Sequence, residues 1–442
     1  MKWVCTCIIS ILFLVAYGQE YPKVSLAPEN IGKIATRPYS IIPWYAIAGK
    51  DYATGEVIAI FDQDTAKKEY DVSELGSIRE EIRGEFRVRN QLINVTTIPL
   101  PNVSSQNNAS RYSQVCGKTL LVLKFSSSVP VEEVIESFRA YVLSTGKKLK
   151  YINPNTTYGI GPEGYGIPAS NSMPDSYIRN STAVTSMSGM NVTVLDTYGG
   201  GADPFNPTNL YGSGQRGHGI WVSNIIKNAV GVSPTADAVC DKDGKCSDSK
   251  VVQGLCTALS NEASIINMSF GSIIDSETLR LAVSDVIRAG SLVVAAVGNT
   301  RDPELLKKRG NLYDKQLFPA SYSWGSQPGM KRFSSGDTYL QSLVVSVGAV
   351  SPTGDFAAYA TQRPIDFVAD EFFQYKASSL PTSYSPGQRG TSYAAPRVTA
   401  AAAKILAKGP RKPSDLIMEL LKYADVNKCR RGDCGAGYII PK

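Results

Sequence analysis

The chain contains a single histidine, which limits the acid–base chemistry that the protein can perform. It is His218, which lies between Gly217 and Gly219 at the start of an amphipathic segment. A lone histidine is most often structural, but any mechanism that uses an imidazole near neutral pH must use this one. A tight, glycine-flanked entry into a helix presents the side chain rather than burying it.

A serine stands at the start of an alanine-rich helical segment. Ser392 follows Gly390 and Thr391, and the segment runs to about Ala407. The free N–H groups at a helix start favour a developing negative charge, as an acyl-transfer nucleophile requires. A serine before a helix is also commonly an N-cap, so its position alone leaves both roles open.

An aspartate ends a predicted strand. Asp196 follows the apolar residues 192–195 and precedes Thr197. A carboxylate at a strand tip can orient an imidazole, although an aspartate there is commonly a turn residue. Each of the three signals is modest alone, and together they indicate a nucleophilic serine site.

The elements that must position these residues alternate along the chain. Continuous apolar runs, typical of strands buried on both faces, lie at 192–195, 236–240, 264–269, 291–297 and 343–350. Helical segments lie near 219–228, 249–261, 276–289, 392–408 and 413–424. This order predicts an α/β fold, a three-layer domain with a mainly parallel sheet, in which catalytic groups sit at strand ends and helix starts.

Five segments resemble motifs of the subtilisin-like serine proteases, in the order of that family. They are VTVLDT (192–197), HGIWV (218–222), INMSFG (266–271), AAVGN (295–299) and GTSYAAPRV (390–398). The resemblance covers about 165–438, and its serine motif is the most specific part. It implies a serine endopeptidase that hydrolyses protein or peptide substrates through an acyl-enzyme.

The resemblance also implies a role for each site residue. Ser392 attacks the scissile carbonyl, His218 transfers the proton and Asp196 orients the imidazole. The side-chain amide of Asn299 stabilises the oxyanion. The residues expected to bind an extended substrate are Gly244, Ser247, Ser269, Phe270 and Gly271.

Several positions depart from the family pattern. Trp221 stands where a second histidine is usual, and Arg397 replaces a common histidine. Asn224 stands where glycine is usual, and VADEF (368–372) lacks the usual Ala-Pro-Gly. No cofactor is expected for catalysis. A structural Ca²⁺ ion is compatible with the family, but no clear run of ligands supports one.

The residues before the catalytic segment predict a pro-enzyme. A strand, a helix and a short strand are expected within 114–160, and this small α+β block resembles the family's inhibitory pro-domain. Residues 19–113 have no assigned fold, and their end, 94–113, reads as an exposed, glycosylated linker. We expect the catalytic domain to span 161–442 and the activating cut to lie within about 150–165.

The first 18 residues have the features of a signal peptide, namely a basic start, an apolar run over 8–16 and small residues before the expected cleavage. No later apolar run is long enough to span a membrane. The sequence therefore predicts a protein that is secreted, or that resides in the lumen of the secretory pathway or at the cell surface.

Six cysteines follow the predicted signal peptide, and in an oxidising compartment they suggest three disulfides. The pairs that we expect first are the two local ones, Cys429–Cys434 and Cys240–Cys246. They leave Cys116 to pair with Cys256. About 15 connectivities are open to six cysteines, so the sequence does not choose among them. Zinc is disfavoured by the single histidine. Six sequons are expected glycosylation sites, at Asn94, Asn102, Asn108, Asn155, Asn180 and Asn191.

Other functions remain as alternatives. A catalytically silent protease-fold surface or binding protein is the main one, and the intact set of site residues argues against it. An α/β-hydrolase esterase would need Gly-x-Ser-x-Gly and a histidine after the serine, and neither occurs. The net charge of +7 is scattered, so we expect no nucleic-acid binding. The tripeptide 431–433, Arg-Gly-Asp, is a weak adhesion motif.

Overall fold

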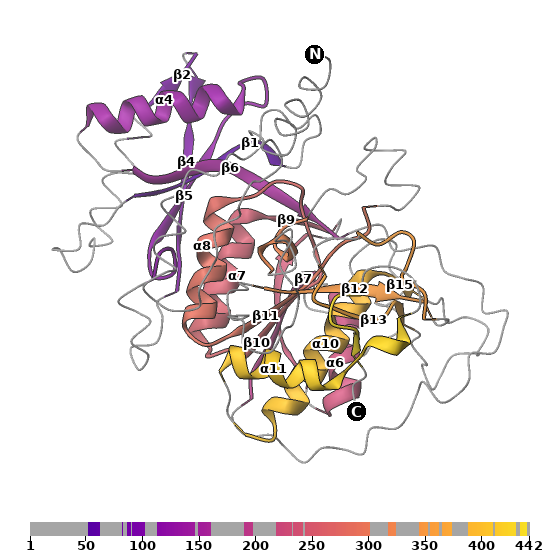
Figure 1. Cartoon of the computed structure of the whole chain (residues 1–442). Helices are drawn as coiled ribbons and strands as arrows, with labels where there is room; N and C mark the ends of the chain where they lie inside the picture. Colours follow the sequence, from indigo (N-terminus) through magenta and orange to yellow (C-terminus); the bar gives the residue numbers. More distant parts are fainter. Residues whose placement is uncertain are drawn as a thin grey trace, which may run out of the picture.

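The computed structural model describes the chain in ranges. They are 52–61, 82, 86–89, 91–101, 113–145, 149–160, 190–197, 218–231, 233–241, 244–300, 317–323, 344–351, 354–361, 365–373, 388–409, 412–429 and 434–439. These ranges form an N-terminal α+β domain and a larger α/β domain, which share one 13-stranded sheet (Figure 1). The predicted signal peptide lies outside the described residues.

The α/β domain is built on a parallel sheet. Its strands, in order across the sheet, are β13 (Phe367–Asp370), β12 (Val345–Val350), β11 (Leu292–Ala296), β10 (Ile265–Met268), β7 (Val192–Thr197) and β8 (Thr235–Cys240). Each strand pairs in parallel with its neighbour. All five strands predicted from continuous apolar runs are present, whereas β13 was not predicted.

Helices cover both faces of this sheet (Figure 1). One face carries α7 (Asp248–Ser260) and α8 (Glu277–Arg288), and the other carries α6 (His218–Val230), α10 (Thr391–Leu406) and α11 (Pro413–Tyr423). Alternate residues of β11 join different cores. Val293 and Ala295 pack in the α7–α8 layer, whereas Val294 and Ala296 pack in the α6–α10 layer. The predicted three-layer α/β fold is therefore confirmed.

The N-terminal domain is an antiparallel sheet covered by one helix. The strands lie in the order β6 (Leu149–Gly159), β1 (Tyr52–Phe61), β5 (Thr119–Lys124) and β4 (Asn94–Pro99). Helix α4 (Val131–Ser144) packs its apolar face on this sheet. Phe138 lies at the centre of the core, with its ring 5.2 Å from that of Phe86 and 6.3 Å from that of Phe61.

This domain corrects the predicted boundaries. Residues 94–99 were expected in an exposed linker, but they form β4 and pair with β5 along its whole length. Strand β1, from the region without an assigned fold, pairs with both β5 and β6. The segment 114–160 is thus one part of a domain that already includes residue 52. The rest of the expected linker, 102–112, lies outside the described residues.

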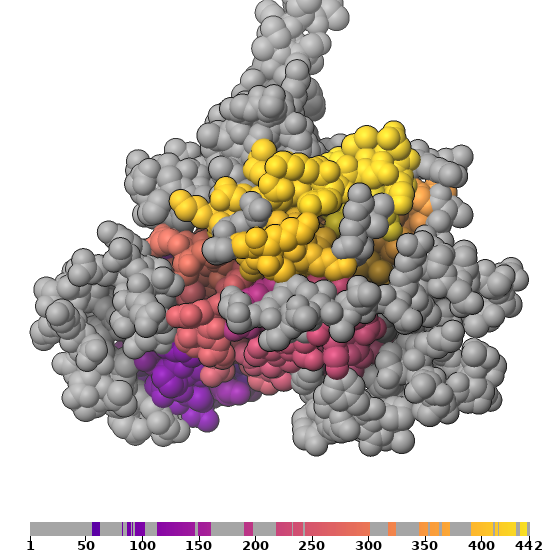
Figure 2. Space-filling model, turned by 90° about the horizontal axis from the view of Figure 1, so that it is seen from below, coloured from indigo at the N-terminus to yellow at the C-terminus, as the bar shows by residue number. Residues whose placement is uncertain are grey.

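The N-terminal sheet buries both of its faces. In β5, Leu121 and Leu123 pack against α4, whereas Leu120 and Val122 join the core that contains α7 and α8. The second face therefore rests on the helical layer of the α/β domain. Figure 2, seen from below, shows residues of the N-terminal domain (purple) directly beside those of the α7–α8 region (salmon).

Polar and covalent links reinforce this contact. The Asp285 carboxylate of α8 accepts hydrogen bonds from the N–H groups of residues 114, 115 and 116 at 2.7–3.1 Å and from the Ser113 hydroxyl at 2.8 Å. Burial raises the pKa of Asp285, and these donors oppose that rise. The disulfide Cys116–Cys256 joins the N-terminal domain to α7.

Two further disulfides and the short elements complete the described structure. Cys240–Cys246 and Cys429–Cys434 close local loops. The short elements are β2 (Arg87–Val88), β3 (Gln91–Leu92), β9 (Lys245–Ser247), β14 (Phe372–Phe373), β15 (Gln388–Arg389), β16 (Ala424–Asp425), β17 (Tyr438–Ile439), η5 (Ala320–Tyr322) and η8 (Val426–Lys428). Within the ranges given above, no helix has the length and apolar character to cross a bilayer.

We expect Phe138→Ala to destabilise the N-terminal domain by about 3–5 kcal/mol, because it empties the centre of a closely packed core. Leu143→Ala is the matched control, since Leu143 lies on the same helix with 79% of its surface exposed. Urea unfolding of both variants in a Ser392→Ala background measures the difference. Equal effects of the two substitutions would contradict this account of the core.

Candidate active site

Asp196 and His218 come from different elements and meet in a buried site. The expectation that the glycine-flanked helix start presents His218 rather than burying it is wrong, because its side chain is 1% exposed. Asp196 lies near the end of β7, and His218 is the first residue of α6. Nδ1 of His218 lies 2.8 Å from Oδ1 and 3.0 Å from Oδ2 of Asp196. Since an ionised carboxylate only accepts hydrogen bonds, this contact holds the proton on Nδ1 and leaves Nε2 as the basic nitrogen.

The residue after the histidine permits this close approach. A Cβ at Gly219 would overlap the carbonyl oxygen of Thr197 and press on the side chain of Asp196. The N–H of Gly219 donates to the Thr197 hydroxyl at 3.2 Å, and the Thr197 N–H donates to Asp196 Oδ1 at 2.6 Å. The glycine therefore lets the start of α6 pack directly on the end of β7.

Ser392 lies within the first turn of α10 and is nearly buried. Gly390 is the N-cap, so Ser392 does not have the capping role that the sequence left open. Its hydroxyl donates to the carbonyl oxygen of Ser269 at 3.2 Å. The ring of the next residue, Tyr393, lies 5.5 Å from the His218 ring. The packing of α10 on α6 thus brings the start of each helix to the same site.

A chain of buried hydrogen bonds supports the backbone of Ser392. The Ser269 hydroxyl donates to the Ser392 carbonyl at 3.1 Å and accepts from the Asn267 amide at 2.9 Å. Thr399, further along α10, donates to Asn267 Oδ1 at 2.9 Å. Sequence analysis gave Asn267 and Thr399 no role in the site. The available signal was an amide side chain inside an otherwise apolar strand.

Asn299 follows β11 and lies beside the start of α10. Its Oδ1 accepts from the N–H of Thr391 at 3.2 Å and from the Thr391 hydroxyl at 3.0 Å. Because a backbone N–H can only donate, this contact identifies the oxygen and places Nδ2 on the other side. A Cβ at Gly390 would lie 3.3 Å from that Nδ2. Asn299 Nδ2 therefore lies beside Gly390, close to the start of α10, and Thr391, which sequence analysis missed, orients the amide.

An extended segment of the N-terminal domain lies between the predicted substrate-binding residues. The end of β6 pairs antiparallel with β9, which includes Ser247. The N–H of Gly159 donates to the Gly271 carbonyl at 2.9 Å, and the N–H of Gly271 donates back at 3.0 Å. The N–H of Ile160 donates to the Gly244 carbonyl at 3.1 Å. The two walls formed by β9 and residues 269–271 thus bind a peptide main chain on both of its edges.

The side chain of Tyr158 fills a pocket in this cleft. It is fully buried, and its ring lies 5.9 Å from that of Phe270. Its hydroxyl donates to Asp248 Oδ1 at 3.0 Å, while Ser276 and Asn153 donate to Oδ2. Burial raises the pKa of Asp248 to about 7, and these hydrogen bonds oppose the rise. Sequence analysis placed the neighbouring Ser247 at the cleft but did not single out Asp248, whose hydrogen bonds to Tyr158 and Asn153 depend on contact between the two domains.

The expected glycosylation of Asn155 is wrong. Asn155 is 1% exposed, its amide donates to Glu56 at 2.7 Å, and its Oδ1 accepts from the N–H of Ser249 at 3.0 Å. A glycan has no room there. Asn94 is exposed, and the partly exposed Asn191 donates to the carbonyl of residue 261. Three expected sites, Asn102, Asn108 and Asn180, lie outside the described residues, as does the tripeptide 431–433.

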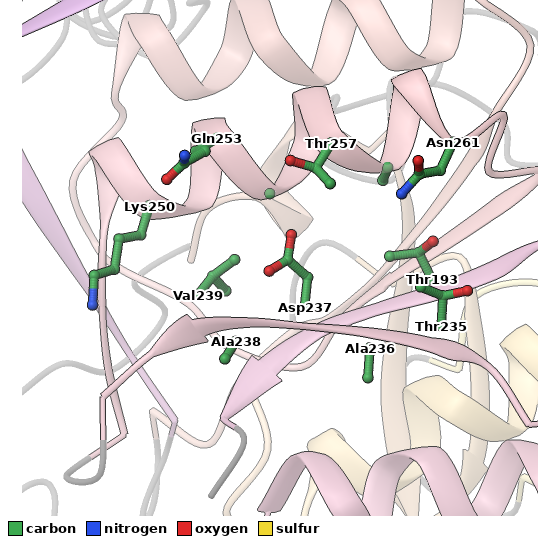
Figure 3. A pocket seen from close by; sticks show the side chains of 12 residues that line it. Thr193, Thr235, Ala236, Asp237, Ala238, Val239, Lys250, Gln253, Thr257 and Asn261 are labelled. Atoms are coloured by element: carbon green, nitrogen blue, oxygen red, sulfur yellow. The ribbon is translucent and has the colours of Figure 1, made fainter. Parts of the chain in front are cut away.

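A separate cavity of about 380 Å³ lies between β8 and α7 (Figure 3). Asp237 points from β8 toward the helix residues Gln253 and Thr257. Burial raises the pKa of Asp237. The lining includes neither Asp196, His218 nor Ser392, so this cavity is distinct from the site. In the described part of the chain, no three acidic, histidine or cysteine side chains are grouped to hold a metal ion.

Comparison with known proteins decides the family. A sequence profile described as the subtilase family matches residues 172–430, which is more than half of the chain. The chain belongs to the subtilase family. The matched range contains Asp196, His218, Asn299 and Ser392, and it follows the N-terminal domain. The predicted resemblance is thereby confirmed at the level of the family.

Individual relatives of this subtilase resemble it over part of its length. The thermostable alkaline protease of Halalkalibacterium halodurans is 30% identical over 52% of this chain and 60% of its own. Subtilisin BL of Lederbergia lenta is 29% identical over 57% of this chain and 89% of its own. The chain spans 52–60% of the length of several of these curated relatives.

One solved structure extends the likeness in fold. Fervidolysin from Fervidobacterium pennivorans, described as a keratinolytic enzyme related to subtilisin, is 19% identical to this subtilase with a TM-score of 0.56. The likeness covers 88% of this chain and 60% of that one. At this identity it shows the fold alone, and it extends beyond the range matched by the family profile.

We expect Asp248→Asn to gain stability relative to its parent as the pH rises from about 4 to about 8. The carboxyl has a pKa of about 7 when folded against an ordinary 3.8. Unfolding therefore releases a proton between these values, and the parent loses stability as the pH rises through this window, by up to about 4 kcal/mol in all. Asparagine does not titrate and escapes the loss.

Urea unfolding at the two ends of this pH window measures the effect, with both proteins carrying Ser392→Ala. Other buried acids, including Asp285 and Glu277, are present in both proteins and cancel in the comparison. Hydrogen bonds changed by the asparagine add a constant offset. A stability difference that stays the same at both pH values would show that Asp248 titrates normally.

Proposed function

We propose that this subtilase is a serine endopeptidase that is made as a pro-enzyme and cuts peptide bonds through Asp196, His218 and Ser392. The observation that carries the proposal is the buried Asp196–His218 pair at the start of α6, packed against the start of α10 that bears Ser392. The activities of the relatives named above support the same reaction class.

The proposed reaction uses each side chain according to its environment. The Ser392 oxygen attacks the scissile carbonyl while its proton passes to Nε2 of His218, because Nδ1 is engaged by Asp196. The oxyanion accepts hydrogen bonds from Asn299 Nδ2 and the N–H of Ser392. His218 returns the proton to the leaving amine. Water then repeats the sequence on the acyl-enzyme and releases Ser392. No cofactor is proposed for this chemistry.

We propose that the N-terminal domain inhibits its own catalytic domain. The end of β6 has the antiparallel main-chain hydrogen bonds that an extended substrate needs, and it lies beside Ser269, which contacts Ser392. A peptide substrate has to displace it. Since β6 extends to Gly159, the part of the expected cleavage window left for the cut is 161–165.

Secretion is part of the proposal. The predicted signal peptide over residues 1–18 and the three disulfides of the structure both suit an oxidising compartment. The predicted substrates are proteins or peptides, which could add as a strand to the edges of β9 and residues 269–271 that β6 occupies in this structure.

A fluorophosphonate probe tests the proposed nucleophile. We expect the secreted protein to be labelled once its N-terminal domain has been cut and removed, and the Ser392→Ala variant to remain unlabelled, because only the activated hydroxyl reacts with the probe. The full-length chain should label less, since β6 occupies the cleft. A wild type that stays unlabelled after its N-terminal domain is shown to be removed would instead support a catalytically silent binding protein.

We expect the cut N-terminal domain to stay attached to the catalytic domain through Cys116–Cys256. After processing, the two pieces should migrate together without reductant and separately with it. The double variant Cys116→Ser/Cys256→Ser should separate under both conditions. Electrophoresis of processed protein gives the result, and two pieces that separate without reductant in the wild type would refute the tether.

A further inference from the structure

Tyr158 shows how a side chain sits in the cleft next to the proposed nucleophile. Its main chain lies in the part of β6 that pairs with β9, one residue before Gly159 and its bonds to Gly271. Its side chain projects from that strand and is completely buried. A substrate that replaces β6 on the same main-chain partners presents one side chain to the same pocket, because side chains alternate along a strand.

The pocket combines an aromatic wall with a buried acceptor. The wall is Phe270, whose ring is 5.9 Å from that of Tyr158. The acceptor is the carboxyl of Asp248, which is 0% exposed and lies 3.0 Å from the Tyr158 hydroxyl. Asp248 begins α7 and therefore belongs to the catalytic domain, so it remains in place when β6 leaves.

Departure of β6 removes two of the three donors that the side chain of Asp248 has in this network. Tyr158 and Asn153 both belong to β6, whereas Ser276 belongs to the catalytic domain. A substrate side chain that buries this carboxyl again without giving it a donor incurs a cost, and the cost falls when the side chain restores a hydrogen bond. The vacated pocket therefore favours a side chain that carries a donor at the distance of Oδ1.

We propose that this pocket selects substrates with a tyrosine at the position that Tyr158 occupies, and that Asp248 is the residue that determines this specificity. The inference rests on the proposed endopeptidase function. A phenol satisfies both parts of the pocket, since its ring packs on Phe270 and its hydroxyl reaches Asp248. A phenylalanine fits the ring but leaves the carboxyl unpaired, and a site built for a hydroxyl discriminates strongly against an analogue without one.

The test is the cleavage profile of the processed protein. A digest of a proteome-derived peptide library, aligned on the cut bond, should show tyrosine enriched at one fixed position on the amino-terminal side. Quenched peptides with Tyr or Phe at that position then give the ratio of kcat/KM. We expect tyrosine to be favoured by about tenfold or more, as for a hydrogen bond to a charged group.

Three variants separate the pocket from general effects. Asp248→Leu removes the acceptor and should bring the Tyr/Phe ratio to about one, and Asp248→Asn, which keeps an acceptor oxygen, should give an intermediate ratio. Glu262→Gln is the matched control, because Glu262 is exposed in the turn after α7 and should keep the wild-type ratio. An unchanged ratio in Asp248→Leu would overturn the proposal.

The same samples distinguish this inference from the proposed function. Fluorophosphonate labelling of Ser392, together with cleavage of unfolded casein, reports on the endopeptidase itself. Labelled protein that cuts Tyr and Phe peptides equally, or that prefers lysine at this position, would overturn only the specificity. Processed protein that neither labels nor cuts casein would overturn both.

Discussion

Three main-chain hydrogen bonds at the end of β6 fix the relation between the two domains. They join Gly159 with Gly271 in both directions and Ile160 with Gly244. Together with the pairing of β6 and β9, they make one sheet out of two. A shift of one residue would turn Tyr158 to the opposite side of the strand. The filled pocket and the fit of the N-terminal sheet on α7 and α8 therefore depend on this register.

The catalytic geometry depends on a different feature, the common edge at which parallel strands end. Asp196, Ser269 and Asn299 lie at the carboxyl ends of β7, β10 and β11. His218 and Ser392 lie in the first turns of α6 and α10, which pack on the face of the sheet opposite α7 and α8. Backbone–side chain hydrogen bonds connect these points, through Thr197 at β7 and Thr391 at α10. The site is thus held by rigid elements rather than by the loops between them.

Sequence analysis predicted the strands that are buried on both faces. It missed strands that pair with segments far away in the sequence. Strands such as β10 and β11 are covered on both faces, so their residues are apolar throughout and easily recognised. Strand β4 alternates polar and apolar residues and contains a sequon and a proline, which resembles a linker. Its partner β5 lies about 20 residues away, and β1 lies further still. A single sequence carries little information about such pairing.

The same limit applies to single residues. Asp196, His218, Asn299 and Ser392 stand in recognisable local motifs, and the structure gathers them at one edge. Asp248 and Asp285 stand in no local motif, and the sequon at Asn155 is misleading, because each of these residues has a hydrogen-bond partner in the other domain. The burial of Asn155 in particular follows only from the contact between β6 and α7. Contacts between domains therefore supply the parts of the site that the local sequence does not encode.

The disulfide between Cys116 and α7 has a consequence for how activation responds to concentration. A separate inhibitor leaves its enzyme on dilution, whereas a tethered domain keeps an effective concentration near its cleft that is set by the tether and reaches about the millimolar range for short connections. In the proposed pro-enzyme, dilution after secretion would therefore not relieve inhibition. Activation would be a first-order process, limited by opening or digestion of the N-terminal domain itself.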